Sequence, residues 1–372
     1  MQSVKKIGNV KGVRVIVRAD FNVPLDGSRV LDDARIRAAL PTIELLRKKG
    51  AKVVLMSHIG RDPETSLKPV VAVLKKHVPV TFVPDVLGER VIAAVENMQN
   101  GDVVLLENLR RDPGEKAGDK IFALALSKLG DCYVNEAFPV SHREDASIVA
   151  LAKILPSFAG IQFEREVSML SKAQDPKHPF LFILGGAKAE TKVPLLARFL
   201  KKADHVFVGG EIANDMYKTM GLAIGKSKTD ELFPDLSKFL KSPKLIVPGT
   251  VVVGRDGNKK TEVYANDVRA GEAIFDIGAK SIDALAPLVK NAKLIVWNGP
   301  LGWYEGGYAD GTERLLALIA DAKAETIIGG GDTAVLAGKK RFAGKFNFVS
   351  TAGGAALDFL ASGTLPGIKA LK

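Results

Sequence analysis

The chain has 372 residues, of which 47% are apolar and 26% charged, values that are ordinary for a globular protein with two domains. No apolar stretch approaches the length of a membrane span, and the basic residues near the N-terminus are not followed by the apolar run of a secretory signal. The single cysteine, Cys132, can form no internal disulfide. We therefore expect a cytoplasmic protein without membrane contacts.

The formal net charge of +11 is the one unusual global value. Such a charge fits either nucleic acid binding or the attraction of small anionic ligands. The lysines are scattered in pairs such as Lys48-Lys49 and Lys201-Lys202 rather than gathered in one run. Aromatic residues make up 6% of the chain and are not interleaved with basic ones as stacking platforms would require. We therefore predict small anionic ligands and no nucleic acid partner.

Apolar strand-like runs alternate with helical patterns along the chain, which is typical of βαβ units and parallel sheets. The predicted strands lie at 13–18, 52–56, 103–108 and 132–138, and then at 180–184, 206–208, 245–247, 294–297, 326–328 and 346–349. A helix is predicted over 33–49, and Pro41 within it should kink it or split it. Residues 254–264 read as a hairpin with its turn at Asp256-Gly257-Asn258.

The two series of strands are separated by the segment 156–160 and a helical stretch at 163–174. We therefore predict an α/β chain of two doubly wound, Rossmann-like parallel-sheet domains joined by a hinge helix. The first domain is expected to cover 1–160 and the second 161–354.

The turns that follow the strands differ between the two halves. In the first half they carry cations and amides: Asp20-Phe21-Asn22, Ser57-His58-Ile59-Gly60-Arg61, Leu109-Arg110 and His142-Arg143. In the second half they carry glycines: Gly185-Gly186-Ala187-Lys188, Gly209-Gly210, Asn298-Gly299-Pro300 and Gly329-Gly330-Gly331-Asp332. Ligands of open α/β sheets bind at the carboxyl ends of the strands, and bare backbone N–H groups suit phosphates. Two such sites suggest transfer of a phosphoryl group between two anions.

Two common nucleotide motifs do not fit. The run 221–227 is one residue short of the Walker A spacing and follows a helical pattern, so it is read as a structural turn. The run 329–334 matches the dinucleotide fingerprint, but the next predicted strand ends in Ser350-Thr351 without an acidic ribose ligand. The pattern therefore disfavours a dehydrogenase.

Seven runs in order carry a resemblance that covers nearly the whole chain: RADFNVP at 18–24, MSHIGR at 56–61, ENLR at 107–110, LGGAK at 184–188, VWNGPLG at 296–302, GGGDT at 329–333 and STAGG at 350–354. With these runs the chain resembles the phosphoglycerate kinases. The resemblance implies reversible phosphoryl transfer between 1,3-bisphosphoglycerate and ADP, giving 3-phosphoglycerate and ATP with Mg²⁺. It also implies a monomer, hinge closure, and the return of residues 355–372 to the first domain.

On the glycerate side, the resemblance implies a cluster of cationic and polar residues, within which Arg35 lies nearest the transferred group. Planar guanidinium groups suit a phosphate and a carboxylate held together. The matching residues are Arg18, Asp20, Phe21, Asn22, Arg35, His58, Ile59, Gly60, Arg61, Arg110 and Arg143.

On the nucleotide side, Lys192 is implied to hold the phosphates, Glu305 to accept from the ribose, and Asp332 to ligate Mg²⁺. The nucleotide residues are Gly186, Ala187, Lys188, Lys192, Gly209, Gly210, Asn298, Pro300, Gly302, Glu305, Gly330, Gly331, Asp332 and Thr333. The groups assigned to the chemical step are Arg35, Lys188, Gly331 and Gly354. Phosphoryl transfer needs positioning and charge stabilisation rather than a covalent nucleophile.

Some positions depart from the family pattern. Glu136 stands where the family has an aspartate, and Pro139 replaces a glycine shortly before Arg143, so the position of that arginine is the one affected. The alternative function, from a different class, is a non-catalytic protein of the same fold that binds polyanions through its basic surface.

Overall fold

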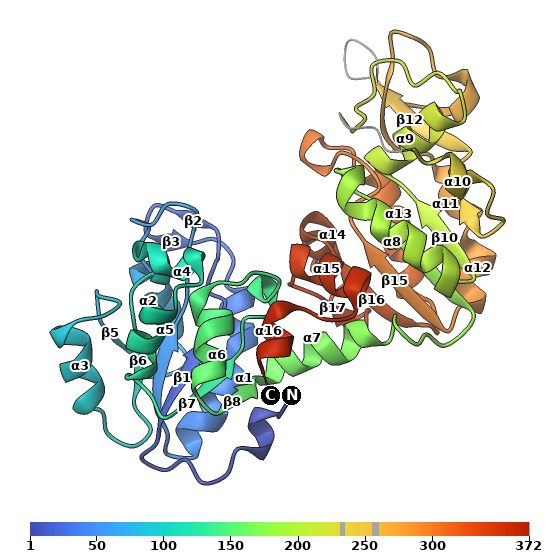
Figure 1. The fold of residues 1–372 in the computed structure, drawn as a ribbon. Coiled ribbons are helices and arrows are strands. Elements are labelled where there is room, and N and C mark those ends of the chain that lie inside the picture. Colours follow the sequence, from blue (N-terminus) through green and yellow to red (C-terminus); the bar gives the residue numbers. More distant parts are fainter. Residues whose placement is uncertain (231–234, 255–259, 372) are drawn as a thin grey trace. The chain divides into compact units, whose positions relative to one another are not determined.

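The structure of the chain is a computed structural model that describes residues 1–230, 235–254 and 260–371. The chain divides into two compact units, here called the first unit and the second unit (Figure 1). The first unit contains residues 1–168 and the residues from 364 onward, and the second contains 169–363. Helix α7 (Ile161–Ser171) therefore crosses the division.

In the described part of the first unit, six parallel strands form one sheet in the order β5-β6-β4-β1-β7-β8. Their bounds are β1 Arg14–Arg18, β4 Lys52–Met56, β5 Thr81–Phe82, β6 Val103–Leu105, β7 Cys132–Asn135 and β8 Ser157–Ala159. A short hairpin pairs β2 (Leu25–Asp26) with β3 (Arg29–Val30). The helices are α1 Ala34–Lys48, α2 Lys68–Leu74, α3 Glu89–Glu96, α4 Pro113–Ala117, α5 Lys120–Ser127, α6 Leu151–Ile154 and α16 Pro366–Ala370. Shorter helical turns are η1 Val4–Lys6, η2 Leu109–Arg111, η3 Phe138–Val140 and η4 Ala146–Ala150.

Helix α1 packs on the sheet of the first unit through residues at helical spacing. Ile36, Ile43 and Leu46 are fully buried in the core with the strand residues of β1 and β4. Of the two outcomes predicted for Pro41, a kink or a split, the split does not occur, because the helix runs unbroken through this residue. Proline in a helix interior costs about 3 kcal/mol, and burial of apolar residues on both sides of it offsets that cost.

The C-terminal segment joins the first unit later than the resemblance implied. Helix α15 (Gly354–Ser362) belongs to the second unit, and only the residues after it belong to the first, rather than all of 355–372. Helix α16 lies beside α6, with the Gly367 N–H donating to the Ser141 carbonyl oxygen at 2.9 Å (Figure 1).

In the second unit, six parallel strands among the described residues form a sheet in the order β11-β10-β9-β15-β16-β17. Their bounds are β9 Phe180–Leu184, β10 His205–Val208, β11 Leu245–Ile246, β15 Leu294–Asn298, β16 Glu325–Gly329 and β17 Phe348–Val349. An antiparallel sheet adds β12 Thr250–Gly254, β13 Lys260–Tyr264 and β14 Ala273–Ile277. The helices are α8 Ala189–Lys202, α9 Glu211–Thr219, α10 Ser237–Leu240, α11 Ala279–Asp283, α12 Ala286–Asn291, α13 Asp310–Ala320, α14 Gly331–Ala337 and α15, with turns η5 Ala265–Asp267 and η6 Tyr304–Gly306.

The central strands of the second unit are buried along their whole length. Every residue of β9 and of β15 is buried, and Trp297 is among the largest fully buried side chains. Strands covered on both faces read as continuous apolar runs, which is why the sequence predicts them. The prediction of an α/β chain with two parallel-sheet domains is confirmed. The turn expected at 256–258 lies outside the described residues, although β12 and β13 do pair as a hairpin.

Among the described residues, none of the helices combines the length and the apolar character that a bilayer span requires.

Candidate active site

The strand order of the first unit gathers the predicted glycerate residues at one edge of its sheet. The chain goes from β1 to β4 on one side and later returns to β7 on the other. Arg18, the last residue of β1, is level with Met56 of β4 and Asn135 of β7. The turns that follow these three strands therefore begin at the same carboxyl edge, beside the point where the strand order reverses. Open α/β sheets bind ligands at that point.

A chain of hydrogen bonds connects five of the predicted residues at this edge. The guanidinium of Arg35 donates to the carboxylate of Asp20 at 2.9 Å and to the Asn22 carbonyl oxygen at 3.2 Å. The side-chain oxygen of Asn22 accepts from the Gly60 N–H at 2.9 Å, and the Gly60 carbonyl accepts from Arg110. The residues expected from three different turns and from α1 thus form one connected network.

Arg18 lies beneath this network and is completely buried. Its Nε donates to Ser147 Oγ at 2.8 Å, its Nη1 to the Ala19 carbonyl, and its Nη2 lies 3.2 Å from His58 Nδ1. The buried carboxylate of Glu115 lies 3.7 Å from Nη2 and accepts from Ser147. These contacts bury the Arg18 guanidinium completely among protein groups.

The positive charge at this edge acts on the imidazole of His58. Burial, followed by the charges of Arg18, Arg110, Arg143 and Arg35, lowers the pKa of His58 well below its usual value. Burial and the neighbouring Arg143 also lower the pKa of Arg110. Cations lower one another's pKa only when they lie close together. The charges of four arginines from four separate elements, β1, α1, η2 and the turn after η3, therefore all act on one buried histidine.

The remaining predicted residues of the first unit fall into two groups. Phe21 and Ile59 are buried in the core, and their N–H groups donate to Ser57 Oγ and Asn108 Oδ1. Arg61 and Arg143 are exposed. Pro139 is accommodated in the turn η3, after which the Arg143 N–H donates to the Val140 carbonyl.

Asn108 is a residue of the site that sequence reasoning missed. It is fully buried, accepts from the N–H groups of Ile59 and Arg110, and donates to the carbonyls of Ile59 and Thr65. It thereby fixes the His58–Arg61 turn to the Arg110 turn. The sequence signal for Asn108 was its position in the ENLR run at 107–110, from which only Arg110 was predicted as a site residue.

In the second unit the glycine turns bond to one another. Strand order again reverses beside β9, between β10 and β15. The Gly185 N–H donates to the Asn298 carbonyl at 2.8 Å, the Gly186 N–H to Pro300 at 2.6 Å, and the Gly210 N–H to Leu301 at 3.0 Å. These N–H groups are thus used within the protein, and not for a ligand as the sequence suggested.

Close approach of backbone to backbone explains why these positions are glycines. A Cβ on Gly299 would lie 2.3 Å from the Gly185 carbonyl oxygen, and one on Gly210 would lie 2.6 Å from the Gly186 nitrogen. Both residues have positive φ, which side chains disfavour. By contrast, Gly331 and Gly354 begin helices α14 and α15 with open space around the position of a Cβ. The helix starts, rather than the interlocked turns, leave room for a ligand.

The two predicted lysines differ in their surroundings. Lys188 is exposed and precedes α8 with φ of +64°, the one positive φ at a non-glycine position in the described chain. Such strain gathers at functional sites. Lys192 is buried, and its ammonium donates to the carbonyls of Gly185 and Ala187. Burial lowers the pKa of Lys192 to about 8, while Glu211 opposes that shift. Helix α8 begins at Ala189, so Lys188 is its N-cap residue, without a side-chain capping bond, whereas Lys192 lies within the helix.

The predicted nucleotide residues from Asn298 onward lie between the end of β15 and the first turn of α14. Asn298 is buried at the end of β15, Gly302 packs against Asp276, and Glu305 is exposed in η6. Asp332 is half-buried in the first turn of α14, where Thr333 Oγ1 is buried without a hydrogen-bond partner among the described residues.

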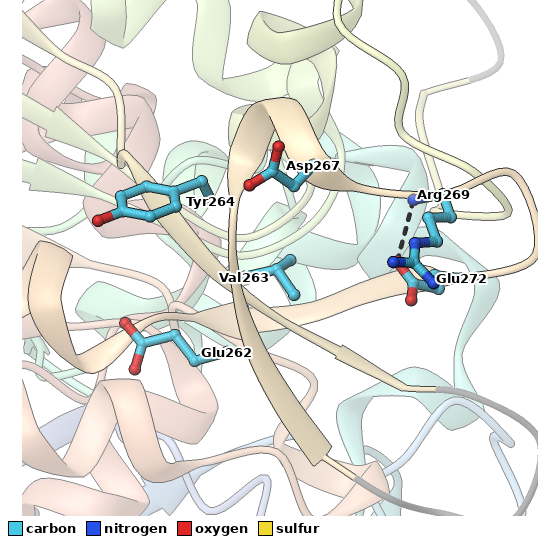
Figure 2. Close-up of a pocket in the computed structure, with 6 residues that line it drawn as sticks. All are labelled: Glu262, Val263, Tyr264, Asp267, Arg269 and Glu272. Atoms are coloured by element: carbon cyan, nitrogen blue, oxygen red, sulfur yellow. Dashed lines mark hydrogen bonds between the residues drawn. The ribbon is translucent and has the colours of Figure 1, made fainter.

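A separate pocket of the second unit contains none of the predicted residues. Its volume is about 450 Å³, and it is lined by Glu262, Val263, Tyr264, Asp267, Arg269 and Glu272 (Figure 2). The Glu272 carboxylate accepts from the Arg269 N–H at 2.9 Å. The described residues contain no group of three or more histidine, cysteine or acidic side chains arranged to hold a metal.

An arginine-rich carboxyl edge on one parallel sheet and glycine turns with lysines on another define a two-domain α/β phosphotransferase. A family model described as Phosphoglycerate kinase matches residues 4–363. The phosphoglycerate kinase of Pseudothermotoga lettingae is 42% identical over 378 residues, covering 96% of this chain and 95% of the relative. That of Zymomonas mobilis is 40% identical, covering 100% of this chain and 99% of the relative.

Solved structures agree with the sequence comparison. The phosphoglycerate kinase from Coxiella burnetii superposes with a TM-score of 0.86 at 34% identity, covering 99% of this chain and 98% of that one. The phosphoglycerate kinase from Pyrococcus horikoshii gives a TM-score of 0.87 at 29% identity, covering 100% of this chain and 98% of that one. This chain therefore belongs to the phosphoglycerate kinase family. The resemblance and the prediction of a phosphotransferase are confirmed at the level of the family.

Proposed function

We propose that the chain catalyses reversible, Mg²⁺-dependent phosphoryl transfer between 1,3-bisphosphoglycerate and ADP, giving 3-phosphoglycerate and ATP. One observation carries the proposal: at the carboxyl edge of the sheet, hydrogen bonds connect Arg35 to Arg110 through Asn22 and Gly60, and Arg18 Nη2 lies 3.2 Å from the buried His58. A concentration of guanidinium groups at a strand edge is suited to a small ligand that carries both a phosphate and a carboxylate. Family membership supports the same substrates.

Within the first unit, Arg35 is the residue best placed to meet the transferred group. Its side chain is 32% exposed, and the Asp20 carboxylate holds its guanidinium in one orientation. A guanidinium held in this way can meet a ligand without a further search of rotamers. Arg110 has a buried Nε without a hydrogen-bond partner among the described residues, which leaves a donor for an anion.

Within the second unit, Lys192 would hold the nucleotide phosphates and Lys188 would follow the moving phosphoryl group. The carbonyls of Gly185 and Ala187 keep the Lys192 ammonium beside the β9 turn. A phosphate would favour the charged amine and raise its pKa from about 8. The N–H groups that begin α14 and α15 would stabilise negative charge developing on the phosphoryl oxygens.

Mg²⁺ would be held by Asp332 together with phosphate oxygens of the nucleotide. A single half-buried carboxylate at a helix start, with the orphaned hydroxyl of Thr333 beside it, fits an ion that arrives with its phosphates. The ion would neutralise charge on the phosphates of the bound nucleotide. Glu305 would accept from the ribose hydroxyls, and Gly209, Gly210, Pro300 and Gly302 would contact the nucleotide.

Because the two groups of residues belong to separate units, transfer requires closure around α7, which also excludes water. The proposal includes a cytoplasmic monomer that binds no nucleic acid. Light scattering tests the monomer, and retention on duplex DNA at physiological salt tests the polyanion-binding alternative.

The decisive experiment is formation of ATP from 1,3-bisphosphoglycerate and ADP, followed by luminescence with and without Mg²⁺. Arg35→Ala serves as the matched control, because the variant lacks one proposed substrate contact on an otherwise intact chain. ATP formation that depends on Mg²⁺ and on Arg35 supports the proposal. A folded protein that forms no ATP but binds duplex DNA tightly would overturn it.

A further inference from the structure

Two buried polar side chains meet at the start of α7, the helix that crosses from the first unit into the second. The hydroxyl of Thr42 donates to Glu136 Oε1 at 2.8 Å and accepts from the Ile161 N–H at 2.8 Å. The same carboxylate accepts from the N–H groups of Gln162 at 3.1 Å and Phe163 at 3.2 Å. The first three N–H groups of α7 are thus all bound by this pair.

The contact is built closely and away from solvent. Thr42 is fully buried and Glu136 is 3% exposed. A Cβ on Gly160 would lie 1.8 Å from Glu136 Oε2, so only glycine admits the carboxylate at this place. Unpaired N–H groups at a helix start require partners, and the oxygens of Glu136 supply them. Burial raises the pKa of Glu136 to about 8, and the bonds from Gln162, Thr42 and Phe163 oppose that shift.

The pair also connects α7 to the elements that carry the glycerate residues. Thr42 lies on α1, the helix that carries Arg35 near its start. Glu136 follows the last residue of β7, at the carboxyl edge where Arg18 of β1 is level with Asn135. A displacement of the start of α7 must therefore break these bonds or be transmitted to α1.

We propose that Thr42 and Glu136 are positioning residues that couple movement of α7 to the placement of Arg35. The inference rests on the proposed function, since it assigns the pair a part in the closure that brings the two substrates together. Neither side chain belongs to the predicted substrate contacts. The pair acts through α1 and α7, so its loss should leave each single ligand bound as before and slow only the step that needs both.

The test compares Thr42→Val with Thr42→Ser. Valine keeps the volume of threonine and removes both hydroxyl bonds, whereas serine keeps the hydroxyl and loses a methyl group. We expect kcat to fall about tenfold in Thr42→Val, because the start of α7 is then no longer bonded to α1 during closure. Calorimetric Kd values for ADP alone and 3-phosphoglycerate alone should stay within about twofold, and Thr42→Ser should recover most of kcat.

Small-angle scattering supplies a second readout that does not need turnover. The decrease in radius of gyration on adding both ligands should be smaller in Thr42→Val and in Glu136→Gln than in the unaltered chain. A lowered Tm with unchanged kcat and unchanged compaction would mean that Thr42 and Glu136 only stabilise the fold. Weaker binding of one ligand alone would mean that the pair belongs to the binding site of that ligand. If the unaltered chain forms no ATP, the proposed function is refuted. The scattering comparison then still tests whether the pair couples the movement of α7 to closure.

Discussion

The buried pair of Arg18 and Glu115 offers a test of whether burial or distance governs the charge pairs of the first unit. Arg18 Nη2 lies 3.7 Å from Glu115 Oε1, and both side chains are 0% exposed. In the exposed pair Arg14–Asp131 the atoms are only 2.6 Å apart, with side chains 34% and 47% exposed. Distance alone ranks the exposed pair as the stronger, whereas burial reverses the order.

Replacing Glu115 by Gln leaves the Arg18 guanidinium buried without its counter-charge. Removing one partner of a buried pair costs about 3–5 kcal/mol, and the lower end applies because Arg18 keeps its bonds to Ser147, Ala19 and His58. For a domain of this size, 1 kcal/mol shifts Tm by about 2–4 °C, so we expect a fall of about 6–12 °C. Asp131→Asn breaks a solvated pair and should cost about 1 kcal/mol or less.

Differential scanning calorimetry at pH 7 measures both variants against the unaltered chain, with urea unfolding followed by circular dichroism as a second measure. The reasoning is refuted if Asp131→Asn lowers Tm as much as Glu115→Gln does. Equal and small effects would mean that water reaches the Arg18 guanidinium.

Two further predictions concern the two halves of the site, and a third concerns the buried carboxyl group of Asp276. Arg35→Ala should lower kcat by roughly two to three orders of magnitude and leave the Kd for ADP unchanged. Lys192→Ala should weaken the binding of ADP and leave the binding of 3-phosphoglycerate unchanged. Titration calorimetry with each ligand alone measures both effects. Asp332→Asn should lower turnover and raise the Mg²⁺ concentration needed for the half-maximal rate, while the Tm stays nearly constant. If the variant unfolded and its Mg²⁺ requirement were normal, Asp332 would act only as a helix cap. Burial raises the pKa of Asp276 to about 7 from 3.8, so the native state holds the extra proton and loses stability as pH rises between these values. In thermal scans from pH 4 to pH 8, the Tm should therefore fall less steeply with pH for Asp276→Asn than for the unaltered chain. Parallel plots of Tm against pH would contradict the raised pKa of Asp276.

The sheets could be predicted from sequence because most of their strands are buried on both faces. The runs at 52–56 and 180–184 match β4 and β9 residue for residue. Strand β8 was missed, since its three residues follow Pro156 and read as a domain boundary. Short strands at a sheet edge carry too few apolar residues to give a periodic signal.

The candidate site was predictable in its positions and less so in its contacts. Residues placed directly after strands came together because parallel strands end at one edge. The burial of Arg18 could not be foreseen, since its partners Glu115 and Ser147 are distant in sequence and carry no motif. In sequence, a glycine that contacts a phosphate looks the same as one that packs against another turn. Only the structure shows that Gly299 and Gly210 pack against a neighbouring turn.

The first unit bears an electrostatic cost that its own carboxylates relieve only in part. Asp20 pairs with Arg35 and Glu115 with Arg18, while Arg110 and Arg143 still lower the pKa of His58. Burial at the same time raises the pKa of Glu115, so adding carboxylates beneath the site would bring its own desolvation cost. A phosphorylated acid bound at the edge would relieve the repulsion without such a cost, because it arrives charged and remains partly solvated. The surplus of arginine that destabilises this edge is thus the same feature that would give it affinity for an anion.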